Sequence, residues 1–270
     1  MLKHLGVSRS GYRAFLRRKV SAREQHKESV KKQIQKIYDK SNQNYGAPKI
    51  TRELRKSGVC IAERTVGKYM KEMGIKAQWV RPWTTTTRNS DFSSELHNVL
   101  DEQFNPERPN AVWCTDITYI WTHDGFVYLT SIMDLYARKI IAWTLSDSME
   151  VSCVIDTINK AKTRRSTDSP LIIHSDRGSQ YVSQMYRKAT AGMQRRYSHQ
   201  GYPYDNACIE AFHSLIKREW LNRFQILNYD HAYRLVFEYI ETFYNTVRIH
   251  SHCDYMSPDD FEKLYEKVAG

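Results

Sequence analysis

The sequence AVWCTDITYIWTHDGFVYLTSIMDL, residues 111–135, decides the fold class of this chain. Its first part, Ala111 to Trp121, is rich in β-branched and aromatic residues, which predicts a strand. The polar tetrapeptide Thr122-His123-Asp124-Gly125 predicts a hairpin turn, and Phe126 to Leu135 predicts a second strand. Arg138 to Leu145 continues the pattern as a third strand. The stretch therefore predicts a sheet of three strands that hairpins join.

The residues after this sheet alternate between helical and strand patterns. One short apolar segment, Leu171 to Ser175, predicts a further strand. Four segments predict helices: Val151–Lys162, Tyr181–Thr190, Ala207–Phe224 and Asp230–Tyr244. No helix is expected after the last of these. Three hairpin-joined strands, a helix, another strand and then helices predict a mixed α/β domain.

Charge is distributed unevenly along the 270 residues. The chain carries 41 Lys and Arg against 30 Asp and Glu, a net charge of +11. Residues 1–90 hold 22 of the basic and 6 of the acidic side chains, a net of +16, whereas residues 91–270 hold 19 and 24, a net of −5. A basic first third joined to a mildly acidic remainder predicts nucleic-acid contact by the first part. A merely soluble, Lys-rich helical surface is the alternative.

The cysteines and the apolar segments indicate the compartment. The five cysteines are scattered and form no C-x-x-C pair, which favours a reducing environment over a disulfide framework or a zinc ribbon. No segment approaches the roughly 20 apolar residues of a membrane span, and the N-terminus has no apolar signal region. We therefore expect a cytoplasmic protein that does not contact a membrane.

The patterns divide the chain into four parts. We expect a basic helical segment over residues 1–23, a helix-turn-helix domain over 24–76, a linker over 77–110 and the α/β core with C-terminal helices over 111–268. The linker lacks periodicity and contains the polar run Thr84–Thr87. In the first segment, Ser8 is placed to cap a short helix that begins near Arg9.

Three helices are predicted in the second part. They cover residues 24–40, Lys49–Arg55 and Ala62–Met73, and the turn Ser57-Gly58 separates the last two. The third helix carries three exposed cations, Arg64, Lys68 and Lys71. A short helix, a turn with Gly and a second basic helix are typical of a DNA-binding helix-turn-helix. A plain three-helix packing module is the alternative.

Three acidic residues of the core stand out by position. Asp116 lies inside the first strand, where a carboxylate among apolar neighbours is costly unless something pairs with it. Asp176 directly follows an apolar strand, at the carboxyl end where α/β sheets place ligands. Glu210 is near the start of the helix that Asp205 or Asn206 is expected to cap. Alone, each is an ordinary salt-bridge, turn or helix-dipole residue; together in one α/β unit they indicate a functional site.

Carboxylates on adjacent elements are suited to divalent metal. Such a set can hold two Mg²⁺ ions about 3.5–4 Å apart, with one ion activating water or a 3′-hydroxyl and the other stabilising the leaving oxygen. Mn²⁺ can substitute for Mg²⁺. On the helix of Glu210, Ser214 and Lys217 share its face. The sequence therefore indicates metal-dependent chemistry at phosphorus.

Three sequence blocks surround these carboxylates: WCTDITY over 113–119, HSDRGSQY over 174–181 and DNACIEAF over 205–212. They closely resemble the catalytic blocks of bacterial insertion-sequence transposases of the orfB type (the IS-three family). That family belongs to the DDE transposase and retroviral integrase superfamily, which has a ribonuclease H-like core. Asn44-Tyr45-Gly46 and a C-terminal block over 244–258 are also similar to this family. The resemblance extends over nearly the whole chain.

The resemblance implies roles for particular residues. Asp116, Asp176 and Glu210 would form the metal-binding catalytic triad, and Lys217 would contact the transposon end. Arg177 is a second cation expected to offset the acidity of the core toward DNA. The implied partners are double-stranded DNA, as transposon ends and as target, further copies of the chain on that DNA, and an upstream-frame product that supplies more DNA-binding helices.

Two other functions are compatible with these residues. A structure-selective nuclease on the same core would hydrolyse DNA without joining it. A catalytically decayed regulator would bind DNA through the helix-turn-helix alone, although the intact triad argues against it. Cleavage of DNA with Mg²⁺ separates the regulator from both enzymes, and strand joining separates the two enzymes.

Overall fold

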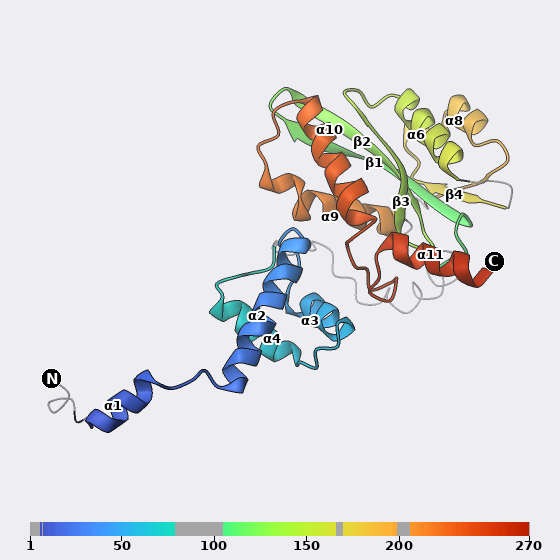
Figure 1. Ribbon diagram of the computed structural model, residues 1–270. Helices are drawn as coiled ribbons and strands as arrows, with labels where there is room; N and C mark the ends of the chain where they lie inside the picture. The colour runs from blue at the N-terminus through green and yellow to red at the C-terminus, as the bar shows by residue number, and fades with distance from the viewer. Residues whose placement is uncertain (1–5, 7, 79–104, 166–169, 199–205, 270) are drawn as a thin grey trace, which may run out of the picture. The chain divides into compact units, whose positions relative to one another are not determined.

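The computed structural model describes residues 6, 8–78, 105–165, 170–198 and 206–269. The chain divides into two compact units, Met1–Trp79 and Val80–Gly270 (Figure 1). Most of the predicted linker, residues 79–104, lies outside the described residues. No helix within the described ranges is long and apolar enough to cross a membrane.

The N-terminal unit is helical. Its described helices are α1 (Arg9–Leu16), α2 (Ala22–Lys40), α3 (Ala47–Lys56) and α4 (Glu63–Glu72). The predicted cap of α1 is confirmed, since the Oγ atom of Ser8 accepts the backbone N–H of Gly11 at 3.0 Å. Pro48 lies in the first turn of α3, where a missing N–H leaves no hydrogen bond unmade.

Helices α2, α3 and α4 pack around a small apolar core. Their buried apolar side chains are Val30, Ile34, Tyr38, Ile50, Leu54, Val66 and Met70. Tyr38 is on the buried face of α2, and its hydroxyl donates to the carbonyl of Lys76 at 2.5 Å. Helix α1 contributes no buried residue.

The second unit is built on a mixed five-stranded sheet with the order β3-β2-β1-β4-β5. Its strands are β1 (Val112–Thr122), β2 (Gly125–Asp134), β3 (Lys139–Ser146), β4 (Ile172–Ser175) and β5 (Gln194–Tyr197). Strands β1, β2 and β3 form an antiparallel meander, whereas β4 and β5 run parallel to β1. The four predicted strands are confirmed, each within one residue of its expected ends.

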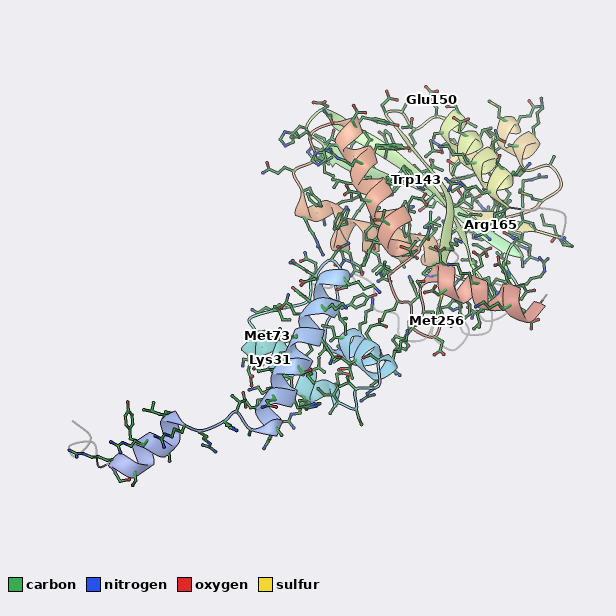
Figure 2. All side chains as sticks on the ribbon, viewed as in Figure 1. Lys31, Met73, Trp143, Glu150, Arg165 and Met256 are labelled. Carbon is green, nitrogen blue, oxygen red and sulfur yellow. The ribbon has the colours of Figure 1, made fainter. Side chains whose placement is uncertain are left out.

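Helices cover both faces of the sheet (Figure 1). Helices α6 (Val151–Arg164), α7 (Ser179–Val182) and α8 (Gln184–Ala189) share one apolar core with the sheet. Helices α9 (Ala207–Glu219) and α10 (Tyr229–Phe237) share a second core on the other face. In that second core, Trp143 of β3, labelled in Figure 2, donates from Nε1 to Glu241 at 2.8 Å.

Several helix predictions need correction. The helix expected over Tyr181–Thr190 is two short helices, because Ser183 has extended backbone and caps α8 by accepting the N–H of Tyr186 at 3.1 Å. The helix expected over Ala207–Phe224 ends at Glu219, and a 3-10 turn, η2, follows over Leu221–Arg223. Helix α10 continues as a π-helix, η3, over Glu238–Tyr244.

Two elements were not predicted. Strand β5 has two arginines and exposed side chains, so its pairing with β4 depends on backbone hydrogen bonds that an apolar pattern does not reveal. Helix α11 (Pro258–Ala269) follows the helix that was expected to be the last. Ser257 begins α11, and its Oγ atom accepts the backbone N–H of Asp260 at 3.2 Å.

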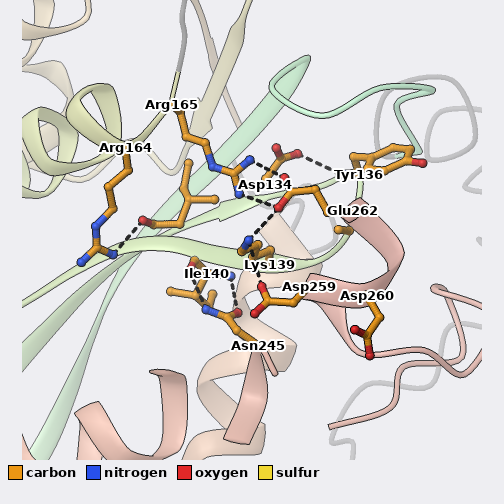
Figure 3. A network of polar contacts seen from close by, with 12 residues as sticks. Asp134, Tyr136, Lys139, Ile140, Arg164, Arg165, Asn245, Asp259, Asp260 and Glu262 are labelled. Atoms are coloured by element: carbon orange, nitrogen blue, oxygen red, sulfur yellow. Dashed lines mark hydrogen bonds and ion pairs between the residues drawn. The ribbon is translucent and has the colours of Figure 1, made fainter. Parts of the chain in front are cut away.

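A polar network joins α11 to the sheet (Figure 3). Lys139 of β3 donates to Asp259 at 2.8 Å and to Glu262 at 2.6 Å, and Arg165 at the end of α6 also contacts Glu262. Next to this network, Asp134 is fully buried at the end of β2. The C-terminal helix is therefore held to the core by buried ion pairs.

Candidate active site

Asp116 and Asp176 belong to neighbouring parallel strands at the same level of the sheet. The register pairs Val112 with Ile172 and Cys114 with His174. Two positions beyond that last pair, Asp116 on β1 stands level with Asp176 just after β4. The Oδ1 atom of Asp176 accepts the backbone N–H of Gly178 at 2.9 Å, which fixes this carboxylate in its turn. The register thus brings together two carboxylates that are far apart in sequence.

Glu210 comes to the same region from the first turn of α9. The neighbouring Ile209 is fully buried in the core cluster that also contains Cys114 and Ile120 of β1. Glu210 itself is exposed. Asn206 occupies the N-cap position of α9, one of the two expected, but makes no side-chain cap hydrogen bond there. The other expected cap, Asp205, lies outside the described residues. The packing of α9 against the sheet sets the place of Glu210.

The charges of the three carboxylates act on one another. Partial desolvation raises the pKa of Glu210, although the side chain reaches solvent, and the charges of Asp116 and Asp176 raise it further. Burial also raises the pKa of Asp176; the N–H of Gly178 opposes this rise and the charge of Asp116 adds to it. Asp116 therefore lies within electrostatic range of both Asp176 and Glu210.

This set of side chains fits a hard divalent cation. All three donors are carboxylate oxygens, the ligands that Mg²⁺ prefers, and a bound cation would relieve the repulsion that adds to the raised pKa values of Asp176 and Glu210. Within the described residues, no three His, Cys, Asp or Glu side chains are already close enough to hold one ion. The three carboxylates therefore lie in one region, but farther apart than the ligands of a bound metal ion.

His213 is a site residue that sequence reasoning missed. Its Nδ1 atom lies 3.3 Å from Oδ2 of Asp116, and its Nε2 atom lies 3.4 Å from the hydroxyl oxygen of Ser131 on β2. His213 is buried, one helical turn after Glu210 on α9. The only sequence signal was that i, i+3 spacing from Glu210, which places two side chains near each other on a helix.

Lys217 lies on α9 two turns after Glu210. Its Nζ atom is 4.5 Å from the centre of the Tyr119 ring, a cation–π contact. Burial lowers the pKa of Lys217, and the charge of Asp116 partly offsets this fall. The side chain of Lys217 is therefore within electrostatic reach of Asp116.

The other predicted cations are exposed. Arg177 directly follows Asp176, and its Nε atom donates to the carbonyl of Ser198 at 2.9 Å. In the N-terminal unit, α4 exposes Arg64, Lys68 and Lys71 and buries Val66 and Met70 on its other side.

The C-terminal block has structural partners. The side chain of Asn245 makes two hydrogen bonds with the backbone of Ile140, at 3.0 and 2.9 Å (Figure 3). Buried Arg248 binds Glu219 at the end of α9 through two hydrogen bonds of 2.8 and 2.7 Å. The hydroxyl of Tyr244 donates to the carbonyl of Arg138 at 3.0 Å. These residues hold α9 and the chain after η3 to the sheet.

Comparison with known proteins matches both units. Two profiles described as Integrase core domain match residues 106–203 and 191–258, and a profile described as HTH-like domain matches residues 25–83. The chain is 36% identical over 250 residues to the transposase for insertion sequence element IS904 of Lactococcus lactis subsp. lactis (strain IL1403), covering 92% of this chain and 99% of that protein. It is 32% identical to transposase InsF for insertion sequence IS3A of Escherichia coli (strain K12), covering 97% of this chain and 92% of that protein. The chain belongs to the IS3 family of transposases.

The fold of this IS3-family transposase agrees with that assignment. A chain in the cryo-EM structure of the simian T-cell lymphotropic virus intasome in complex with PP2A regulatory subunit B56 gamma is similar to it, with a TM-score of 0.50, 14% identity and coverage of 84% of this chain and 73% of that one. The predicted family, the ribonuclease H-like α/β core with helix-turn-helix helices, and the DDE-type transposase and integrase activity are confirmed. The transposase acts in DNA transposition.

Proposed function

We propose that this transposase cuts and joins DNA at the ends of an insertion sequence, with Asp116, Asp176 and Glu210 as the catalytic, metal-binding residues. The proposal rests on one observation above all. Three carboxylates from β1, the end of β4 and α9 lie within electrostatic range of one another, and the charge of Asp116 adds to the raised pKa values of Asp176 and Glu210. We further propose the boundaries 1–23, 24–76, 77–110 and 111–268 for the four parts of the chain.

The metal ions are two Mg²⁺, for which Mn²⁺ can substitute. When bound, they would activate a water or the 3′-hydroxyl of the DNA as nucleophile and stabilise the leaving oxygen during in-line attack on a phosphodiester. Asp116 and Asp176 would hold them from two strands whose register fixes both residues. Glu210 would complete the set from α9. His213 would keep the carboxylate of Asp116 in one orientation.

The same carboxylates would repel the DNA backbone in the absence of cations. The chain's own cations near the site reduce that repulsion. Lys217, beside Tyr119, would hold a phosphate of the transposon end. Arg177, the residue after Asp176, would face the DNA strand bound at the site. Both side chains would act by charge and position rather than by transferring protons.

The N-terminal unit would supply most of the affinity for duplex DNA. Residues 1–90 carry the net charge of +16, and Arg64, Lys68 and Lys71 form an exposed row on α4. An element has two ends and a target, so we propose that several copies of the chain assemble on DNA. An upstream-frame product that adds DNA-binding helices fits the same scheme.

The test is a cleavage and joining assay with labelled duplexes that carry the ends of the encoding element. The proposal expects Mg²⁺-dependent cutting at the end and transfer of that end into a second duplex. Cutting without joining would instead identify a nuclease on the same core. Binding without either reaction would identify a regulator.

A further inference from the structure

Exposed aromatic rings gather on the core beside the carboxylates. Tyr119, Trp121 and Phe126 of the β1–β2 hairpin are 60%, 61% and 48% exposed, and Phe224 after η2 is 39% exposed. Tyr119 and Trp121 both stand edge-on to Phe126, with ring centres 5.4 and 4.8 Å apart. Large rings that stay this exposed and lie together are typical of a binding surface.

The rings border a groove. It has a volume of about 490 Å³, and Tyr119 and Trp121 line it from β1 while Asn222, Phe224 and Gln225 line it from the segment after α9. This volume lies within the roughly 300–1,000 Å³ of pockets that hold small ligands. Flat apolar faces and amide side chains therefore meet in one space large enough for a nucleotide.

The groove is held in shape by the backbone. The N–H of His123 donates to the carbonyl of Ile226 at 3.0 Å, and the N–H of Asp124 donates to that of Leu227 at 3.3 Å. These bonds tie the hairpin turn to the chain after η2. A groove with two tied walls needs little reordering to bind a ligand, which favours affinity.

One end of the groove meets the candidate active site. Lys217 lines it, with Nζ 4.5 Å from the centre of the Tyr119 ring. Tyr119 follows Asp116 by three residues on β1, about 10 Å at the rise of an extended strand, and this odd separation places the two side chains on opposite faces of the strand. The link between the groove and the carboxylates is therefore Lys217, which contacts the Tyr119 ring and lies within electrostatic range of Asp116.

These features fit a particular ligand. A base inside a duplex presents only its edges, whereas an unpaired base presents a flat face that stacks on an aromatic ring. We propose that the groove binds an unpaired base of the DNA strand that the carboxylates cut or join, stacked on Tyr119 or Trp121, with its phosphate beside Lys217. This inference rests on the proposed function. The positive charge of Lys217 in the lining favours a nucleotide, which carries a phosphate, over a second copy of the chain as the occupant.

The first experiment measures binding of the full chain to two probes without added divalent metal, so that neither is cut. One probe is a duplex with the paired terminal sequence of the encoding element, and the other is the same duplex with its last few nucleotides unpaired. The open probe should bind about 5- to 150-fold more tightly, the range of base–aromatic stacking.

Variants assign that preference to the groove. Trp121→Leu or Tyr119→Leu should lose it, while Trp121→Phe and Tyr119→Phe, which keep a flat ring, should retain most of it. Phe237→Leu is the matched control, because Phe237 is a 46% exposed aromatic on α10 that does not line the groove. Iodouracil in the unpaired segment should crosslink to Tyr119 or Trp121.

Two results would overturn the inference. Equal affinity for both probes in the wild type, or a preference that both leucine variants keep, would show that no base stacks here. A change in the sedimentation of the DNA-free leucine variants, with the probe preference intact, would show an interface between copies. If the wild-type protein prefers open ends but never joins DNA, that result would contradict the proposed function but not the binding of a base in the groove.

Discussion

The Nδ1 atom of His213 lies 3.3 Å from the Oδ2 atom of Asp116, inside the core of the second unit. A neutral imidazole can donate from Nδ1 to this carboxylate and accept the hydroxyl hydrogen of Ser131 at Nε2. The contact joins the helix that carries Glu210 to the strand that carries Asp116. His213 is thus placed to fix Asp116, one of the proposed catalytic carboxylates, relative to the helix that carries Glu210.

Replacing His213 should therefore slow the chemistry without weakening DNA binding. His213→Leu is expected to lower the strand-transfer rate about 10- to 100-fold, as loss of a partner behind a metal ligand usually does. His213→Asn, whose amide nitrogen can stand near the Nδ1 position, should recover part of that loss. Single-turnover rates and DNA titrations measure both quantities. Equal rates for the two variants, or a fall in affinity alone, would refute the positioning role.

Loss of a carboxylate should abolish strand transfer. Asp116→Asn or Asp176→Asn removes a charged metal ligand but changes the side-chain volume little. An activation free energy higher by several kcal/mol lowers the strand-transfer rate more than about a thousandfold. The metal-free Asp176→Asn protein should be at least as stable as the wild type, because the charge of Asp176 is repelled by Asp116. Exposed Asp156 on α6 offers the control Asp156→Asn, which should transfer strands normally. Strand transfer by Asp116→Asn or Asp176→Asn would overturn the assignment.

Lys217→Ala should weaken binding of DNA ends and flatten its salt dependence. One lost phosphate contact lowers the slope of log affinity against log salt by about 0.9 for duplex DNA. Lys217→Arg should keep the slope. The control is Lys188→Ala, at an exposed lysine of α8. An unchanged slope with reduced turnover would place Lys217 in the chemistry instead.

The second unit without the basic third should fold but bind DNA poorly. Residues 91–270 carry a net charge of −5, so most counterion-releasing side chains are lost with residues 1–90. The shortened chain should keep at most weak, Mn²⁺-dependent nicking at low salt. Titrating labelled duplex with both chains at several salt concentrations checks this. Equal affinity and equal slope would mean that the basic third is a solvated surface.

Asp134 should make the fold less stable as pH rises from about 4 to 6. Burial raises its pKa to about 6, although the backbone N–H groups of Asn110 and Tyr136 oppose this. The unfolded chain releases the proton near pH 4, so between these values the folded state holds more protons and loses about 3 kcal/mol, to order of magnitude.

Urea unfolding across that pH range, followed by tryptophan fluorescence, measures the effect. Asp134→Asn should show a shallower fall in the free energy of unfolding, even if the amide costs stability at every pH by leaving one N–H without its acceptor. The pKa values of Asp176 and Glu210 are also raised, so their effect has the same sign and is shared by both proteins. Identical slopes would contradict the assignment to Asp134.

The sequence predicted those parts of the fold that local pattern specifies. Alternating and apolar runs located β1 to β4 because side chains on a half-buried strand repeat every two residues. Strand β5 was not predicted because its pairing with β4, rather than the pattern of its own side chains, holds it at the sheet edge. Helix α11 depends on ion pairs from Glu262 to residues about a hundred positions earlier, which a local pattern does not contain.

The site divides in the same way. Asp116 and Asp176 could be singled out because each carboxylate interrupts or directly follows an apolar strand, and Glu210 because it opens a helix. His213 could not, because a histidine in an amphipathic helix is ordinary until its partner is known, and that partner is a strand residue 97 positions earlier. The aromatic groove likewise forms only when the β1–β2 hairpin meets the chain after α9.

Only three residue pairs join β1 to β4. The loops between β1 and β4 can lengthen or shorten over evolutionary time without moving either carboxylate, since the strand pairing and the turn after β4, where the N–H of Gly178 holds Asp176, fix them. A single residue inserted between Cys114 and Asp116 would turn the carboxylate to the opposite face of the sheet. Descendants of this element should accordingly tolerate insertions around α6 and purge them within Trp113–Asp116 and His174–Asp176.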